Sequence, residues 1–106
     1  YTDALEAQLT QRWEDARLVV FGHLGDGNLH ISVSVGSAEV EVRREVEAMV
    51  YQPLAALGGS VSAEHGIGLE KRPWLSTCRS SAEIALMQSL KQALDPLNLL
   101  NPGKVL

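Results

Sequence analysis

An α+β fold, with helices packed on a small antiparallel sheet in a ferredoxin-like arrangement, is predicted by the order of periodic segments in the sequence. The segments follow one another as helix, strand, strand, helix, short strand and helix. The strands alternate polar and apolar residues around a glycine-rich turn, whereas the helices repeat apolar residues every three or four positions. With 106 residues, the chain can form one domain that buries roughly two-thirds of the surface exposed by its unfolded form.

The first and last helices carry the clearest start signals. Asp3 with Glu6 and Ser80 with Glu83 have the spacing of a capping box, in which two side chains satisfy the first backbone N–H groups. Asp95, which a proline follows, is expected to end the last helix. The predicted stripes are Leu5, Leu9 and Trp13 in the first helix and Ile84, Met87, Leu90, Lys91 and Leu94 in the last.

Residues 17–21 (RLVVF) and 30–35 (HISVSV) are predicted to be antiparallel strands joined by the turn LGDGN. Because successive side chains point to opposite faces of a strand, Ile31 lies opposite to His30 and Ser32. The face that carries His30 is polar and is therefore available for chemistry.

The middle of the sequence predicts a second helix that begins after Ser37. Pro53 should kink this helix or end it early, and Gly58 with Gly59 should terminate it. Residues 60–63 are predicted to form a short strand that leads into the segment EHGIG. The predicted buried stripe of the second helix is Val42, Val46, Met49, Val50, Leu54 and Leu57.

The composition excludes several classes of protein. The net charge of −4, with nine Lys and Arg spread along the chain, provides no basic stripe for nucleic acid. No apolar run approaches the roughly 18 residues that span a bilayer, so no transmembrane segment is predicted. Cys78 is the single cysteine, which excludes an internal disulfide and a cysteine-based zinc site. We expect a reducing compartment, the cytoplasm, while a peripheral membrane location of the full-length protein stays open.

All three histidines lie in two glycine-flanked segments. His23 and His30 bracket LGDGNL, so they occupy opposite strand ends beside the turn and can point at a common centre. The other segment holds Glu64 next to His65. A divalent ion such as zinc needs three or four nitrogen or oxygen ligands, which makes these residues candidates. The spacing favours a metal site only slightly over ordinary polar histidines, and Asp26 is interpreted as a turn residue.

Three longer segments contain these residues and the end of the chain: GHLGDGNLH (residues 22–30), GGSVSAEHGIGLEK (residues 58–71) and LDPLNLLNPGKVL (residues 94–106). In this order they resemble the C-terminal domain of FAD-linked D-2-hydroxy-acid dehydrogenases. That family includes D-lactate dehydrogenases, D-2-hydroxyglutarate dehydrogenases and the flavin subunit of glycolate oxidase. The resemblance implies that residues 1–106 are a C-terminal substrate- and metal-binding domain, and that the N-terminal FAD-binding domain belongs to a longer chain.

The resemblance also implies roles for the histidine segments. His23, His30 and Glu64 correspond to residues that hold a divalent metal, commonly zinc, in the family. The metal binds the oxygens of the substrate and makes its hydroxyl easier to deprotonate. His65 corresponds to the catalytic base, which takes the hydroxyl proton while hydride passes to FAD.

Further contacts follow from the same resemblance. Asn101 and Lys104 are implied to contact the flavin, and a simple Pro-Gly turn is the alternative. Ser32 is a candidate substrate contact that faces the same side as His30, although some relatives carry Asn there. Lys71 and Arg72 are interpreted as a solvated face, because the clamp for the substrate carboxylate is expected upstream.

Two functions are consistent with the sequence. The first is part of an FAD-dependent dehydrogenase that oxidises a small D-2-hydroxy acid, of the D-lactate or D-2-hydroxyglutarate type, to the 2-oxo acid. The second is a non-catalytic metal-binding or dimerisation module, since such folds host many roles. A homodimer is compatible with either function. His65 distinguishes the enzyme from the binding module, because only the enzyme needs a base. The chain alone is expected to be inactive, since it has no phosphate-binding glycine loop before a helix.

Overall fold

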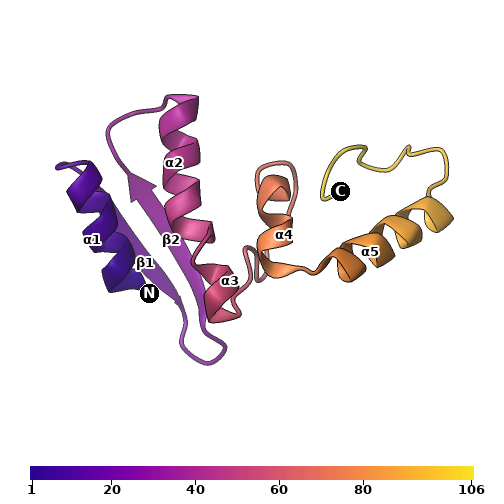
Figure 1. The fold of residues 1–106 in the computed structure, drawn as a ribbon, viewed down its shortest axis with the longest axis horizontal. Coiled ribbons are helices and arrows are strands. Elements are labelled where there is room, and N and C mark those ends of the chain that lie inside the picture. Colours follow the sequence, from indigo (N-terminus) through magenta and orange to yellow (C-terminus); the bar gives the residue numbers. More distant parts are fainter. The chain divides into compact units, whose positions relative to one another are not determined.

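A computed structural model describes residues 1–106, which form two compact units, Tyr1–Gln52 and Pro53–Leu106. The elements in order are α1 (Thr2–Arg12), β1 (Arg17–His23), β2 (Asn28–Ser34), α2 (Val40–Tyr51), α3 (Leu54–Leu57), the 3₁₀ helix η1 (Arg72–Trp74), α4 (Leu75–Cys78) and α5 (Ser81–Leu94) (Figure 1). The first unit combines helices with a small antiparallel sheet, which confirms the predicted α+β class. None of the helices combines the length and the apolar character that crossing a membrane requires.

Helix α1 buries one side against the rest of the first unit. Leu5 and Leu9 are only 2% and 1% exposed, which confirms two members of the predicted stripe, and the helix contacts both β1 and α2. The predicted capping box at Asp3 is wrong, because the N-cap is Tyr1, two residues earlier, and Tyr1 makes no side-chain cap bond. The Tyr1 hydroxyl instead donates to the Val50 carbonyl oxygen (2.6 Å) and ties α1 to α2.

Strands β1 and β2 form the predicted antiparallel hairpin. The register beside the turn is Phe21 with His30, Gly22 with Leu29 and His23 with Asn28. Pairing therefore extends two residues closer to the turn on each strand than the sequence predicted. The missing side chain of Gly22 permits this approach, because a Cβ atom there would lie 2.0 Å from the Asn28 carbonyl oxygen.

The two faces of the hairpin differ in exposure. On one face, Ile31 and Val33 are half-buried. They line a groove together with residues of α2 such as Val46. On the other face, Val19 and Phe21 are 58% and 61% exposed. Because directly paired residues share a face, the register places the side chains of His30 and Ser32 on this open side, as the sequence predicted. The open face is available to a ligand.

Helix α2 differs from its prediction at the start and agrees with it at the end. Ser37 does not cap it: the Ser37 Oγ atom accepts from the Glu39 N–H (3.3 Å), and the helix begins only at Val40. The hydroxyl is used in a local turn before the helix, which is a common competing role for serine. The helix ends at Tyr51, two residues before Pro53, so the predicted interruption by proline is confirmed.

The second unit begins with the short helix α3, which ends at Gly58 as predicted, with that glycine at φ 64°. Leu57 is 60% exposed, so its assignment to a buried stripe is wrong. The predicted strand at residues 60–63 is also wrong, because these residues are irregular. The Ser60 Oγ atom donates to the Ser62 carbonyl oxygen (3.0 Å), and this local bond replaces the strand pairing that the pattern suggested.

Helix α5 starts with the predicted capping box. The Glu83 N–H donates to the Ser80 Oγ atom (3.3 Å), and the Ser80 N–H donates to Glu83 Oε2 (2.8 Å). These bonds from the backbone and side chain of Ser80 lower the pKa of the Glu83 carboxyl. On the predicted stripe of this helix, however, Leu90 and Leu94 are 53% and 81% exposed.

Asp95, which ends α5 as predicted, also anchors the tail that follows. Its side chain is 7% exposed and accepts from the Lys91 ammonium group. The N–H groups of Leu99 and Leu100 donate to its two oxygens, each at 2.9 Å. The bonds from Lys91, from the Leu100 backbone and from the Leu99 backbone lower the pKa of Asp95 from 3.8 to about 2, against the opposing effect of burial. The ionised form of the Asp95 carboxylate is therefore the one that holds the tail.

An Asp95→Asn substitution is expected to lower the midpoint of thermal unfolding by several degrees at pH 7, measured by circular dichroism. Because folding lowers the pKa of Asp95, its stabilisation is complete above pH 3.8 and is lost as the pH falls towards 2. The difference between the variant and the wild type should therefore shrink over that range. Asp15→Asn, at an exposed turn, is the control and should match the wild type. A deficit of Asp95→Asn that persists unchanged at pH 2 would contradict this role.

Candidate functional site

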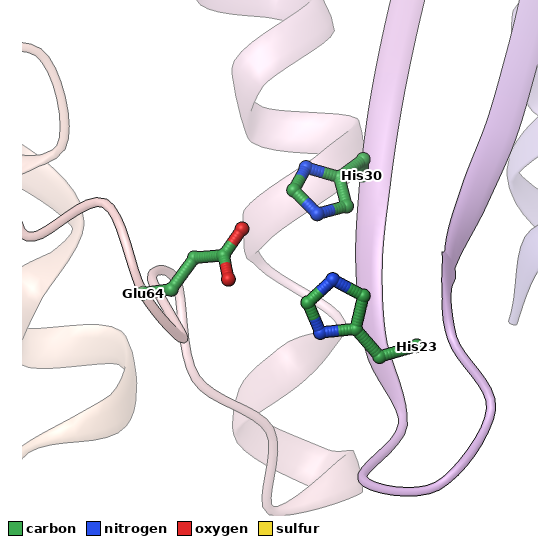
Figure 2. A group of neighbouring side chains, drawn as sticks. All are labelled: His23, His30 and Glu64. Carbon is green, nitrogen blue, oxygen red and sulfur yellow. The ribbon is translucent and has the colours of Figure 1, made fainter.

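The hairpin brings His23 and His30 together. His23 ends β1 opposite Asn28, so His30, two residues further along β2, is its diagonal neighbour on the same face. The two ring centroids lie 5.5 Å apart with the planes tilted by 56°, and a nitrogen of one ring lies within 4.8 Å of a nitrogen of the other. Figure 2 shows the two imidazoles on the same side of the hairpin. The predicted convergence of these residues is confirmed.

The geometry of this pair suits a divalent transition metal. Zinc binds histidine nitrogen at about 2.0–2.1 Å, so two such ligands of one tetrahedral ion lie roughly 3.4 Å apart. Nitrogens that lie within 4.8 Å of each other can reach this separation by rotation of the imidazole rings about their side-chain torsions. The His23 side chain is 50% exposed, which leaves room for further ligands. The donor set therefore fits a metal that has additional ligands from elsewhere.

The turn between the two histidines is held by its own backbone and by Asp26. The Gly27 N–H donates to the His23 carbonyl oxygen (3.0 Å), and Gly27 has a φ of 70°, which favours glycine. Asp26 Oδ1 accepts from the Asn28 N–H (3.1 Å), so Asp26 has the predicted turn role. Its other oxygen lies 3.8 Å from His23 Nδ1, which is too far for a hydrogen bond. The turn fixes the backbone from which His23 projects.

Glu64 and His65 lie in the irregular loop before η1, in the second unit. Both are exposed, and His65 Nε2 lies 3.0 Å from Glu64 Oε1. Figure 2 labels the Glu64 side chain on this loop. The contact favours the imidazole tautomer that carries its hydrogen on Nε2, so that Nδ1 is the basic nitrogen. The loop thus places a carboxylate and a basic imidazole side by side.

Hydrogen bonds within the second unit hold this loop in place. The Ser62 hydroxyl donates to the Gly66 carbonyl oxygen (2.7 Å) and accepts from Lys71 Nζ (3.3 Å). Arg72 Nη1 donates to the Gly103 carbonyl oxygen (2.8 Å), which ties the segment after the loop to the C-terminal tail. Arg72 is exposed, as the interpretation of a solvated face predicted, whereas Lys71 is half-buried, and both side chains also make hydrogen bonds within the unit. Their partners lie 9 and 31 residues away, so no local pattern indicated these bonds.

The remaining predicted residues lie in two places. Ser32 is exposed on β2 opposite Val19, on the same face as His30. Asn101 and Lys104 belong to one turn, in which the Lys104 N–H donates to the Asn101 carbonyl oxygen (3.2 Å) and Lys104 Nζ lies 3.4 Å from Asn101 Oδ1. The Pro-Gly turn considered in the sequence is thus present, and it holds both candidate flavin contacts together.

Sequence reasoning missed Phe21. Its ring stacks on the imidazole of His30, with centroids 4.9 Å apart and an angle of 8° between the planes. The register of the hairpin was the signal that could have found it, because Phe21 and His30 are directly paired. That register becomes evident once the turn is limited to residues 24–27.

Comparisons with known proteins agree on one family. The family described as FAD linked oxidases, C-terminal domain, matches residues 3–105. A D-2-hydroxyglutarate dehydrogenase of Xanthomonas citri pv. viticola is 47% identical over 94% of this chain and 22% of its own length. The mitochondrial D-2-hydroxyglutarate dehydrogenase of Danio rerio is 43% identical over 84% of this chain and 17% of its own. A protein of Schizosaccharomyces pombe named as a mitochondrial D-lactate dehydrogenase is 41% identical over 82% of the chain and 16% of its own. The chain thus spans about a fifth of the length of these curated relatives.

Proposed function

The chain belongs to the family of FAD-linked oxidase C-terminal domains, and on that premise we propose that it is the metal- and substrate-binding part of a longer D-2-hydroxy-acid dehydrogenase. The names of the relatives mention D-2-hydroxyglutarate and D-lactate. Both compounds carry a hydroxyl group on the carbon next to a carboxylate. This shared chemistry defines the proposed substrate class, and the FAD-binding part of the protein would lie in the sequence outside residues 1–106.

The observation that carries the proposal is the pair of imidazoles on the open face of the hairpin, with nitrogens within 4.8 Å of each other. We propose that His23 and His30 are two ligands of one divalent ion, with zinc as the first candidate. Glu64 is proposed as the third ligand, because the family resemblance assigns that role to its motif and carboxylate oxygen suits the same ions. Three protein ligands leave a coordination position for substrate, as catalytic zinc sites do.

The reaction separates a proton and a hydride from the substrate. When bound, the metal supplies Lewis acidity towards the hydroxyl and carboxylate oxygens, and FAD supplies the hydride acceptor. His65 accepts the hydroxyl proton at Nδ1, and Glu64 fixes its tautomer through the contact with Nε2. Loss of the proton to His65 and of hydride from C2 leaves the 2-oxo acid. The hydrogen bonds of Ser62 and Arg72 hold the segments around this base in place.

Contacts to substrate and flavin are proposed for three further residues. Ser32 can donate to the substrate from the face that carries His30. The turn that joins Asn101 and Lys104 presents an amide and an ammonium group, both suited to a polar flavin ring edge. We also propose a reducing compartment such as the cytoplasm, because the chain contains one cysteine and therefore no disulfide of its own.

A substrate screen tests the proposed function. The full-length protein is assayed with D- and L-2-hydroxy acids and an artificial electron acceptor, before and after treatment with a chelator. We expect turnover of a D-acid, a loss of about 100-fold or more on metal removal, and recovery with zinc. His23→Ala should fail to recover at the zinc concentration that restores the wild type. Full turnover by protein that contains no divalent metal would contradict the proposal.

A further inference from the structure

The Phe21 ring lies on the exposed face of the hairpin, stacked on His30. The two rings are nearly parallel, at 8°, and their centroids are 4.9 Å apart. Atoms of stacked rings touch at about 3.5–4.0 Å, so the rings are offset, which is the arrangement that aromatic pairs prefer. Direct pairing of the two residues across the strands fixes the contact through the backbone register.

Core packing does not account for this phenylalanine. The residue is 61% exposed, so it adds little to the interior of the first unit. The groove between β2 and α2, on the opposite face, is lined by other residues. What Phe21 does contact is one face of an imidazole. The effect of the ring is therefore expected at His30 and not in the core.

We propose that Phe21 is a positioning residue for the metal ligand His30. The torsion that turns a histidine ring has a broad energy minimum, so an exposed imidazole samples many orientations. Stacking on Phe21 restricts the ring to one plane and directs its nitrogen towards the position shared with His23. A cation bound to His30 withdraws electrons from the imidazole, and the negative face of the phenyl ring then attracts it more strongly. This inference rests on the proposed function, since it requires that His30 binds the ion.

The chain offers a matched control on the same strand and face. Val19 is two residues before Phe21, is 58% exposed and pairs with Ser32 instead of a histidine. Val19→Ala shortens an exposed side chain of the same strand and leaves the stacked pair of Phe21 and His30 in place. Phe21→Tyr keeps an aromatic face, whereas Phe21→Leu keeps apolar volume and removes the stack.

The test measures zinc binding by the full-length protein in competition with a chromophoric chelator. Phe21→Leu is expected to raise the Kd for zinc about 3- to 10-fold. Phe21→Tyr and Val19→Ala should stay within about twofold of the wild type. The absorption bands of bound Co²⁺ provide a second readout, which should change shape in Phe21→Leu as the geometry of the ligands loosens. Circular dichroism confirms that each variant is folded, and Phe21→Met replaces Phe21→Leu if the latter is not.

A double-mutant cycle separates positioning from a general effect on the hairpin. In a His30→Ala background, Phe21→Leu should have no further effect on the Kd for zinc, because the residue through which it acts is gone. An equal loss in both backgrounds would overturn the proposal, as would wild-type affinity in Phe21→Leu. Either of these two results would overturn the role of Phe21 without contradicting the proposed metal site. Absence of zinc binding by the wild-type protein would instead remove the proposed function on which the inference rests.

Discussion

His65→Ala in the full-length protein is expected to lower kcat for a D-2-hydroxy acid by about 10²- to 10⁴-fold, the usual contribution of a positioned general base. The variant should keep its divalent metal, because His65 is the proposed base and not a ligand. The rate of flavin reduction in a single turnover measures the chemical step, and metal analysis of the same sample measures occupancy. Glu64→Gln should differ by losing metal along with activity.

This comparison also separates an enzyme from a metal-binding module without chemistry. In a module, the base has no function, and His65→Ala would leave every measurable property close to the wild type. If flavin reduction in the variant stays within about twofold of the wild type, His65 is not the base. The proposed division of roles between Glu64 and its neighbour would then be wrong even if the metal is present.

The second large effect is expected at Gly22, where the strands of the hairpin approach most closely. An added Cβ atom would lie 2.0 Å from the Asn28 carbonyl oxygen, 3.0 Å from its carbon and 3.1 Å from the Leu29 Cα atom. All three are backbone atoms, so no side chain can rotate away. Gly22→Ala should therefore separate the strands beside His23. We expect a loss of about 1–3 kcal/mol or more in the free energy of unfolding, measured by denaturant titration.

A matched control lies three residues further along the same motif. A Cβ atom on Gly25 would meet nothing within 4 Å, so Gly25→Ala should stay within about 0.5 kcal/mol of the wild type. Gly22→Ala should also weaken zinc binding, because the register that makes His23 and His30 neighbours is disturbed. Equal stability and equal zinc affinity of the two variants would show that close strand approach at Gly22 is unimportant.

Local sequence patterns predicted the parts of the fold that depend on neighbouring residues. The period-two alternation identified the hairpin, and the spacing of Ser80 and Glu83 identified the start of α5. The same patterns failed at residues 60–63, where serine hydroxyls bond to the nearby backbone and no strand forms. The capping box predicted at Asp3 failed because helix α1 begins two residues too early for it, with Tyr1 at the N-cap. Where a helix starts, and whether a serine hydroxyl bonds to the nearby backbone, depend on local geometry that residue type alone does not determine.

In the candidate site, too, local patterns predicted some features and missed those that depend on distant segments. The convergence of His23 and His30 follows from a short turn between two strands, and the spacing of the residues predicted it. The roles of Glu64, His65 and Asn101 came from the family resemblance and stay predictions. Bonds between distant segments, such as that of Arg72 to the tail, leave no trace in a local pattern. The anchoring of the tail by the carboxylate that ends α5 was missed for a related reason, since two of its partners are backbone groups.

The most direct test of the shared metal site is a crystal structure of the full-length protein with zinc and FAD, recorded at the zinc absorption edge. We predict one anomalous peak at about 2.0–2.2 Å from a nitrogen of His23, a nitrogen of His30 and an oxygen of Glu64, with His65 close by but not bound to the ion. A zinc peak held by other residues, or an absence of zinc between the two hairpin histidines, would contradict the account.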